Sequence, residues 1–119
     1  MPTILLVEDD NAVRDVIRQH LVDAGLTVIG APDTTVADEV LGRGQPVDLM
    51  LVDLVMPAGQ PDGLTFATQA RSEHPDVPII FLTAYYGFVA RAGQMPGAVL
   101  YKPIDLDVLT REVTAALRH

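Results

Sequence analysis

The chain lacks cysteine and tryptophan, and it contains one lysine against seven arginines. Without cysteine there are no disulfides or thiolate metal sites, which fits a reducing compartment. No stretch reaches the roughly 18 uncharged apolar residues that a membrane span needs. The start, Met1-Pro2-Thr3, has none of the basic residues that open a secretory signal. We therefore expect a cytoplasmic chain with no membrane insertion.

Basic residues are few throughout the chain. The 16 Asp and Glu residues outnumber the 8 Lys and Arg residues, which gives a formal net charge of -8 at pH 7. Direct binding to nucleic acid requires a basic footprint, so this balance argues against it. With 119 residues, 49% apolar and 20% charged, the chain has the size and composition of one ordered domain over residues 1–119.

Five short apolar runs alternate with stretches in which apolar residues recur at helical spacing. Strands of a parallel sheet covered on both faces are nearly continuous in aliphatic residues, as the first, third and fourth runs are. The alternation predicts an α/β fold, a doubly wound parallel sheet with helices on both faces and right-handed crossovers. The runs cover Thr3–Val7, Thr27–Ile29, Val47–Val52, Ile79–Leu82 and Ala98–Tyr101.

Acidic residues precede several of the predicted helices. Asp10 or Asn11 is placed to cap the first helix, Asp33 precedes the second, and Asp105 takes the cap position of the last. Residues 85–92 form a weaker pattern, because Gly87 lies within it and Gly93 and Pro96 follow closely. We expect the fourth helix, in this stretch, to be short or irregular.

Polar residues whose side chains can bind a metal ion or react directly follow the predicted strands. Glu8, Asp9 and Asp10 follow the first run, Asp53 the third, Thr83 the fourth, and the single lysine, Lys102, the fifth. Doubly wound sheets bind ligands beyond the carboxyl ends of their strands. These groups should therefore meet at one edge of the sheet.

Phosphoryl transfer to a carboxylate would use all of these groups. Mg²⁺ prefers oxygen ligands and offsets the repulsion between neighbouring carboxylates. One carboxylate can then act as the nucleophile, while an ammonium group and a hydroxyl stabilise the phosphoryl oxygens. Each residue alone also has a structural explanation, as a helix cap, a loop acid, a strand-end threonine or a surface lysine. Their joint occurrence at successive strand ends favours the site.

At these residues the chain resembles the receiver domain of response regulators, the phosphoacceptor part of two-component signalling. The markers are "LLVEDD", "LVDLVMP" followed by "DG", "FLTA" and "YKP", and together they span nearly the whole chain. The resemblance implies a flavodoxin-like sheet with strand order 2-1-3-4-5.

The resemblance also implies a Mg²⁺ site. Asp9 matches the direct carboxylate ligand, and Glu8 matches the neighbouring acid that acts through a metal-bound water. Asp53 matches the phosphorylated aspartate, which is a ligand as well. Val55 matches the position whose backbone carbonyl completes the metal shell.

Two further positions complete the implied machinery. Thr83 matches the switch hydroxyl, and Lys102 matches the lysine that pairs with the phosphate, followed by Pro103 in a bond that is commonly cis in the family. The implied phosphate donor is a sensor histidine kinase or a histidine phosphotransfer protein. The implied output is a downstream protein target, with the chain as a monomer or weak dimer. Transfer to Asp53 and its reversal would be self-catalysed, so the chain is a signalling switch and not an enzyme in the ordinary sense.

The sequence departs from the family pattern in three places. Val99 stands where an aromatic residue often lies, three positions before the lysine, so we expect no tyrosine gate there. The loop at residues 58–61 is two residues longer than usual. The segment between Thr83 and Lys102 is shorter than usual and rich in glycine.

Two other functions compete with the switch. The altered segment before Lys102 leaves open an adaptor that binds proteins without phosphorylation. An aspartyl-phosphate phosphatase would need a second acid two residues after the nucleophile, where this chain has Val55.

Overall fold

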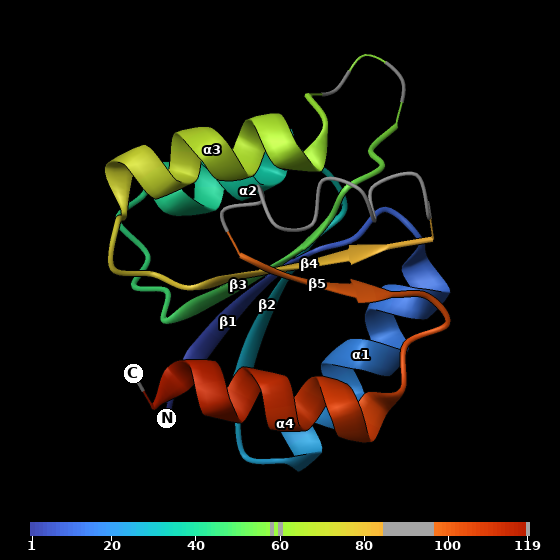
Figure 1. Ribbon diagram of the computed structural model, residues 1–119. Helices are drawn as coiled ribbons and strands as arrows, with labels where there is room; N and C mark the ends of the chain where they lie inside the picture. The colour runs from blue at the N-terminus through green and yellow to red at the C-terminus, as the bar shows by residue number, and fades with distance from the viewer. Residues whose placement is uncertain (58, 60, 85–96, 119) are drawn as a thin grey trace.

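The computed structural model describes residues 1–57, 59, 61–84 and 97–118 (Figure 1). Within these ranges five strands form one parallel sheet in the order β2-β1-β3-β4-β5, which confirms the predicted architecture. The strands are β1 (Thr3–Val7), β2 (Thr27–Ala31), β3 (Leu49–Asp53), β4 (Ile79–Thr83) and β5 (Ala98–Tyr101). The helices are α1 (Asn11–Asp23), α2 (Thr34–Gly42), α3 (Gly63–Glu73) and α4 (Leu106–Leu117).

Three strands differ from their predicted bounds. β4 ends at Thr83, not Leu82, because Thr83 still pairs with Tyr101 of β5. β2 continues to Ala31 because Gly30 pairs with Leu6 and the Ala31 carbonyl accepts from the Glu8 N–H at 3.0 Å. β3 begins later and ends at Asp53, not Val52, because Asp53 still pairs with Leu82 of β4. The nucleophile candidate therefore lies on the rigid end of a central strand and not in the following loop.

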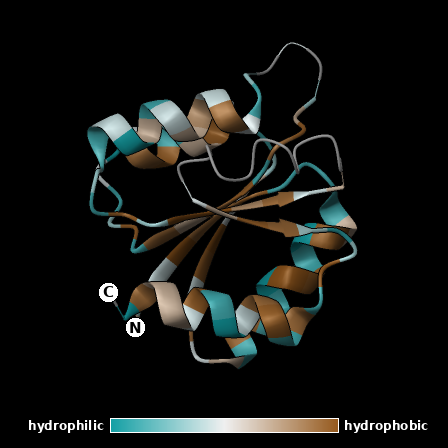
Figure 2. Ribbon diagram, viewed as in Figure 1, coloured by the Kyte–Doolittle hydropathy of each residue, from teal (hydrophilic) through white to brown (hydrophobic). Residues whose placement is uncertain are grey.

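The sheet separates two helical layers. α2 and α3 cover one face, and α1 and α4 cover the other (Figure 1). Alternate residues of β1 serve the two cores, because successive strand side chains point to opposite faces. Leu5 and Val7 join the core under α2 and α3, whereas Ile4 and Leu6 join the core under α1 and α4. Figure 2 shows the strands as the apolar centre and the outer helix faces as mostly hydrophilic.

Aspartates cap the helices as the sequence predicts. The carboxylate of Asp10 accepts from the Val13 N–H at 3.1 Å, that of Asp33 from Val36 at 2.9 Å, and that of Asp105 from Val108 at 3.1 Å. Asp62 caps α3 in the same way. These caps satisfy N–H groups that have no partner within the helix. The helix expected over 85–92 lies outside the described residues.

Candidate functional site

The carboxyl edge of the sheet brings the predicted polar residues to one place. β1 and β3 are neighbours at the centre of the sheet, so Glu8 and Asp53 emerge side by side. Both side chains are buried, with 0% of Glu8 and 4% of Asp53 exposed. Thr83, at the end of β4, is also fully buried. Burial of this many polar groups requires partners, because an unpaired buried charge is strongly unfavourable.

Lys102 supplies the positive charge at this edge. Its Nζ donates to Glu8 Oε1 at 2.5 Å and to Asp53 Oδ2 at 3.1 Å. Its backbone N–H donates to the Thr83 carbonyl at 2.8 Å, which fixes the chain after β5 against β4. The Lys102–Pro103 peptide bond is cis, as the family resemblance implies. The single lysine of the sequence thus contacts both buried acids.

One ammonium group facing two carboxylates shifts the ionisation of the site. Burial raises the pKa of Glu8 to about 8, a hydrogen bond with Asp53 adds to the rise, and Lys102 counteracts it only in part. Burial acts to lower the pKa of Lys102, but the hydrogen bond to Glu8 and the charge of Asp53 outweigh it, so that pKa is raised. At neutral pH the lysine is therefore charged, and Glu8 largely retains its proton.

Three carboxylates at this edge fit a small divalent cation. Glu8, Asp9 and Asp53 each offer one oxygen, and these oxygens lie within 4.8 Å of one another. Asp9 is exposed while the other two are buried, so the group opens to solvent on one side. A hard cation such as Mg²⁺ takes oxygen ligands and keeps several waters. The donor set and its open side match that requirement.

Val55 lies just beyond β3, with 55% of its residue surface exposed. Its N–H donates to Asp53 Oδ1 at 3.1 Å, which helps to fix the orientation of the Asp53 carboxylate. The metal contact expected from the Val55 carbonyl stays a prediction. On β5, Val99 packs against the core under α2 and α3, and Tyr101 pairs with Thr83 in the sheet register.

Two further residues shape the site, and sequence reasoning missed one of them, Arg14. Arg14 Nη1 donates to the Glu8 carbonyl at 2.7 Å. Gly63, the first residue of α3, lies so close to Asp53 that an added Cβ would be 2.1 Å from the Asp53 carbonyl oxygen. The "DG" motif marked Gly63, but only the three-dimensional contact explains it. Arg14 had a weaker signal, an arginine one helical turn after the acidic run.

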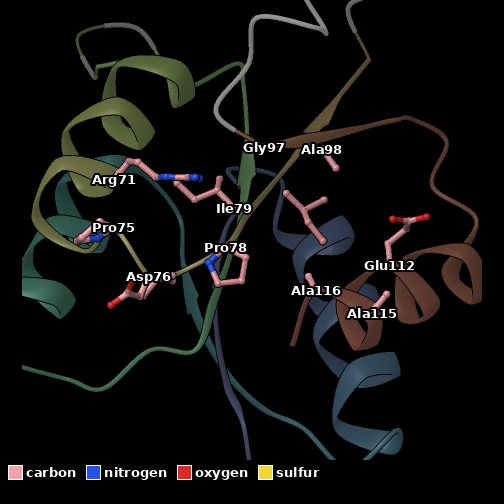
Figure 3. A pocket seen from close by; sticks show the side chains of 12 residues that line it. Arg71, Pro75, Asp76, Pro78, Ile79, Gly97, Ala98, Glu112, Ala115 and Ala116 are labelled. Atoms are coloured by element: carbon pink, nitrogen blue, oxygen red, sulfur yellow. The ribbon is translucent and has the colours of Figure 1, made fainter. Parts of the chain in front are cut away.

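Several cavities lined by described residues lie outside this cluster, and two of them are informative. An apolar one of about 360 Å³ borders Lys102, between α1 and the segment leading into α4, and is lined by Val13, Val16, Ile104 and their neighbours. Another, of about 680 Å³, lies at the opposite, amino end of β4 and β5. In Figure 3 Arg71 reaches from α3 toward Ile79 in this second cavity, and Glu112 lies across from it on α4. The first cavity shares Lys102 with the acid cluster.

Among the described residues, no helix combines the length and apolar character required to cross a bilayer.

A doubly wound sheet with acids, a hydroxyl and a lysine at its carboxyl edge defines a class of ligand-responsive α/β domains. Comparison with known families narrows the class. The model of the response regulator receiver domain matches residues 4–114. The chain belongs to this family, and it is a receiver domain of two-component response regulators.

Named relatives agree with this assignment. Response regulator MprA of Mycobacterium leprae (strain TN) is 40% identical over 119 residues, which cover 98% of this chain and 51% of the relative. MprA of Mycobacterium bovis (strain BCG / Pasteur 1173P2) is 38% identical over 98% of this chain and 50% of the relative. The chain thus spans about half the length of these relatives.

Solved structures show the same fold. The response regulator TrrA from Thermotoga maritima, in complex with Mg²⁺ and BeF, has a TM-score of 0.87 and 26% identity, with 98% of this chain and 99% of that chain covered. A receiver protein from Sinorhizobium medicae WSM419 has a TM-score of 0.89 and 27% identity, with coverages of 98% and 94%.

Proposed function

We propose that Asp53 accepts a phosphoryl group with the help of Mg²⁺ and thereby switches a protein-binding surface. The observation that carries this proposal is the contact of Lys102 Nζ with both Asp53 and Glu8. These two buried acids lie at the carboxyl edge of the sheet, next to the exposed Asp9. A cation beside the nucleophile neutralises charge on the phosphoryl oxygens as transfer proceeds.

The residues divide the chemistry between them. A carboxylate oxygen of Asp53 attacks the phosphorus of a phosphohistidine whose other ring nitrogen carries a proton. The O–P bond forms, the P–N bond breaks, and the histidine side chain leaves as neutral imidazole. Lys102 pairs with one phosphoryl oxygen, and the Thr83 hydroxyl donates to another. Glu8, Asp9, Asp53 and the Val55 carbonyl would hold Mg²⁺, which supplies further positive charge when bound. Transfer and later hydrolysis are self-catalysed, and no separate general acid is required.

Protonation of Glu8 bears on when the cation binds. With the pKa of Glu8 near 8, a proton must leave that carboxyl before it can act as a charged ligand. Lys102 donates to both Glu8 and Asp53, and a phosphoryl group on Asp53 would bring its oxygens within reach of the same ammonium group. The lysine is therefore placed to exchange a carboxylate partner for the phosphate.

The donor is a sensor histidine kinase or a histidine phosphotransfer protein. The apolar cavity beside Lys102, lined by Val13, Val16 and Ile104, offers a docking surface next to Asp53. Val16 lines this cavity and is 55% exposed, so its side chain is accessible to a partner. A panel of phosphorylated histidine kinases identifies the one that phosphorylates the wild type fastest. Val16→Asp should slow phosphoryl transfer from that kinase and leave the rate of labelling by acetyl phosphate unchanged. Equal slowing with both donors would count against docking.

The test of the acceptor uses a small-molecule donor. Wild-type protein treated with acetyl phosphate and Mg²⁺ should gain the mass of one phosphoryl group by intact-mass spectrometry, and Asp53→Asn should not. Asp15→Asn, an exposed acid of α1, is the matched control and should be labelled like the wild type. Labelling of Asp53→Asn would remove Asp53 from its role. A wild type that neither takes up the group nor responds to Mg²⁺ would favour the phosphorylation-independent adaptor.

A further inference from the structure

The side chain of Arg14 crosses from α1 to the end of β1. Its Nη1 donates to the Glu8 carbonyl at 2.7 Å, and its Nη2 donates to Asn11 Oδ1 at 2.5 Å. The guanidinium thus ties together both ends of the turn between β1 and α1. Asp9, the exposed acid of the cation cluster, lies within that turn.

Gly30 of β2 leaves the space through which this side chain passes. A Cβ at Gly30 would lie 3.2 Å from Arg14 Cδ, which is tighter than an ordinary van der Waals contact. No left-handed backbone angle calls for glycine at this position. The close approach of the arginine is therefore the physical reason for a small residue there.

The main chain of Glu8 is held from two sides. Its N–H donates to the Ala31 carbonyl at 3.0 Å, and its carbonyl accepts from Arg14. Two positions further on, Asp10 is fixed as the cap of α1. Together these bonds determine the direction in which residues 8 and 9 present their carboxyl groups.

We propose that Arg14 is a positioning residue for the divalent cation: it holds the turn at residues 8–11 so that Glu8 and Asp9 face Asp53. This inference rests on the proposed Mg²⁺ site and adds a residue that does not itself touch the ion. Groups that orient metal ligands change affinity by about 10- to 100-fold when they are removed.

The charge of Arg14 and its hydrogen bonds predict opposite effects. If only its charge mattered, replacing it with a neutral residue would remove a repulsive cation near the site and strengthen Mg²⁺ binding. If it positions the ligands, the same replacement weakens binding despite the lost repulsion. The sign of the change therefore separates the two explanations.

The experiment compares Mg²⁺ affinity by isothermal titration calorimetry in wild type, Arg14→Met and Arg18→Met. Arg18 lies one turn further along α1 and matches the change in charge without a bond to the turn. Arg14→Met should bind Mg²⁺ about tenfold more weakly or worse, and Arg18→Met should bind as the wild type does or slightly more tightly. Backbone amide shifts of residues 8–10 should change in Arg14→Met alone.

Gly30→Val gives an independent test that keeps every charge. The valine side chain should displace Arg14 and weaken Mg²⁺ binding, as Arg14→Met does. If Arg14→Met does not fold, Gly30→Val alone tests whether Arg14 positions the ligands. Affinity in the folded variants equal to or tighter than that of wild type would overturn the role of Arg14 alone. A wild type without Mg²⁺ affinity would overturn the proposed metal site itself, and this inference with it.

Discussion

At the scale of single residues, the ammonium group of Lys102 lies between two buried carboxylates. It compensates one negative charge, and the second is avoided by retention of a proton on Glu8. This arrangement stabilises the cation-free site, because two adjacent buried carboxylates with one lysine would otherwise leave a charge without compensation. Proton and divalent cation are thus alternative ways to neutralise the same group.

Replacing Glu8 with Gln should change how stability depends on pH. The folded-state pKa of Glu8 is about 8 against an ordinary value of 4.5, so between these values the folded chain binds a proton that the unfolded chain has lost. Stability from this group is present below about pH 4.5 and is lost as pH rises towards 8. The wild type in EDTA should lose on the order of a few kcal/mol across this range.

Urea denaturation at pH 5 and pH 8, in EDTA, measures this loss. Glu8→Gln cannot titrate and should show a smaller drop in the free energy of unfolding over the same interval. All other titratable groups are the same in both proteins, so the difference between the two slopes isolates Glu8. Equal slopes would mean that Glu8 is ionised throughout.

Most residues of the site could be predicted from the sequence. The two features that were missed, the role of Arg14 and the pKa of Glu8, both depend on the three-dimensional surroundings of a residue. Asp53 and Lys102 meet as expected, since both lie at the carboxyl ends of strands in one parallel sheet. Arg14 was missed because its role is to hold a backbone carbonyl, and no side-chain pattern reports which carbonyl an arginine will reach. The pKa of Glu8 was missed because it depends on depth of burial.

At the scale of elements, α3 begins directly against the strand that carries Asp53. The Gly63 N–H donates to the Leu54 carbonyl at 3.0 Å, and the position has no room for a side chain. The acceptor strand and the helix start therefore form one packed unit. A shift of α3 would move the backbone beneath Asp53.

Gly63→Ala should destabilise the domain and impair the site together. A methyl group 2.1 Å from the Asp53 carbonyl oxygen forces backbone movement, and overpacking of this kind costs about 1–3 kcal/mol. The free energy of unfolding from urea titration gives the first effect, and the rate of labelling by acetyl phosphate gives the second. Gly42→Ala, in α2 with open space around it, is the control and should be neutral or stabilised by up to about 1 kcal/mol. Equal behaviour of the two variants would contradict this account.

The starts of helices could be predicted where a capping side chain sets them. The ends of strands could not be predicted where pairing with a neighbouring strand sets them. Asp10 and Asp105 cap helices through their own side chains, so the sequence alone indicates them. The end of β3 at Asp53 depends instead on its pairing with Leu82, and the extension of β2 through Gly30 depends on Leu6. Pairing between distant strands leaves little trace in a local pattern.

At the scale of the whole molecule, binding at the acid cluster is linked to folding, because the three carboxylates come together only in the folded sheet. Mg²⁺ at a hundredfold excess over its dissociation constant should stabilise the domain by about 2.7 kcal/mol. For a chain of this size that corresponds to a rise in Tm of roughly 10 °C.

Thermal melts in EDTA and in saturating MgCl₂ test this linkage. Asp9→Asn loses the exposed carboxylate and should show much less of the rise, while Asp15→Asn should keep it. A rise of the same size in Asp9→Asn would indicate general ion screening and not a site.

The contact between Lys102 and Glu8 joins residues 94 positions apart. During synthesis the three acids leave the ribosome long before the lysine does. A half-made chain carries the acids but has no ammonium group to receive phosphoryl oxygens. On the proposed role of Lys102, the chain should become competent for phosphoryl transfer only once β5 and Lys102 are in place, and unfinished chains should not drain phosphoryl groups from the pathway.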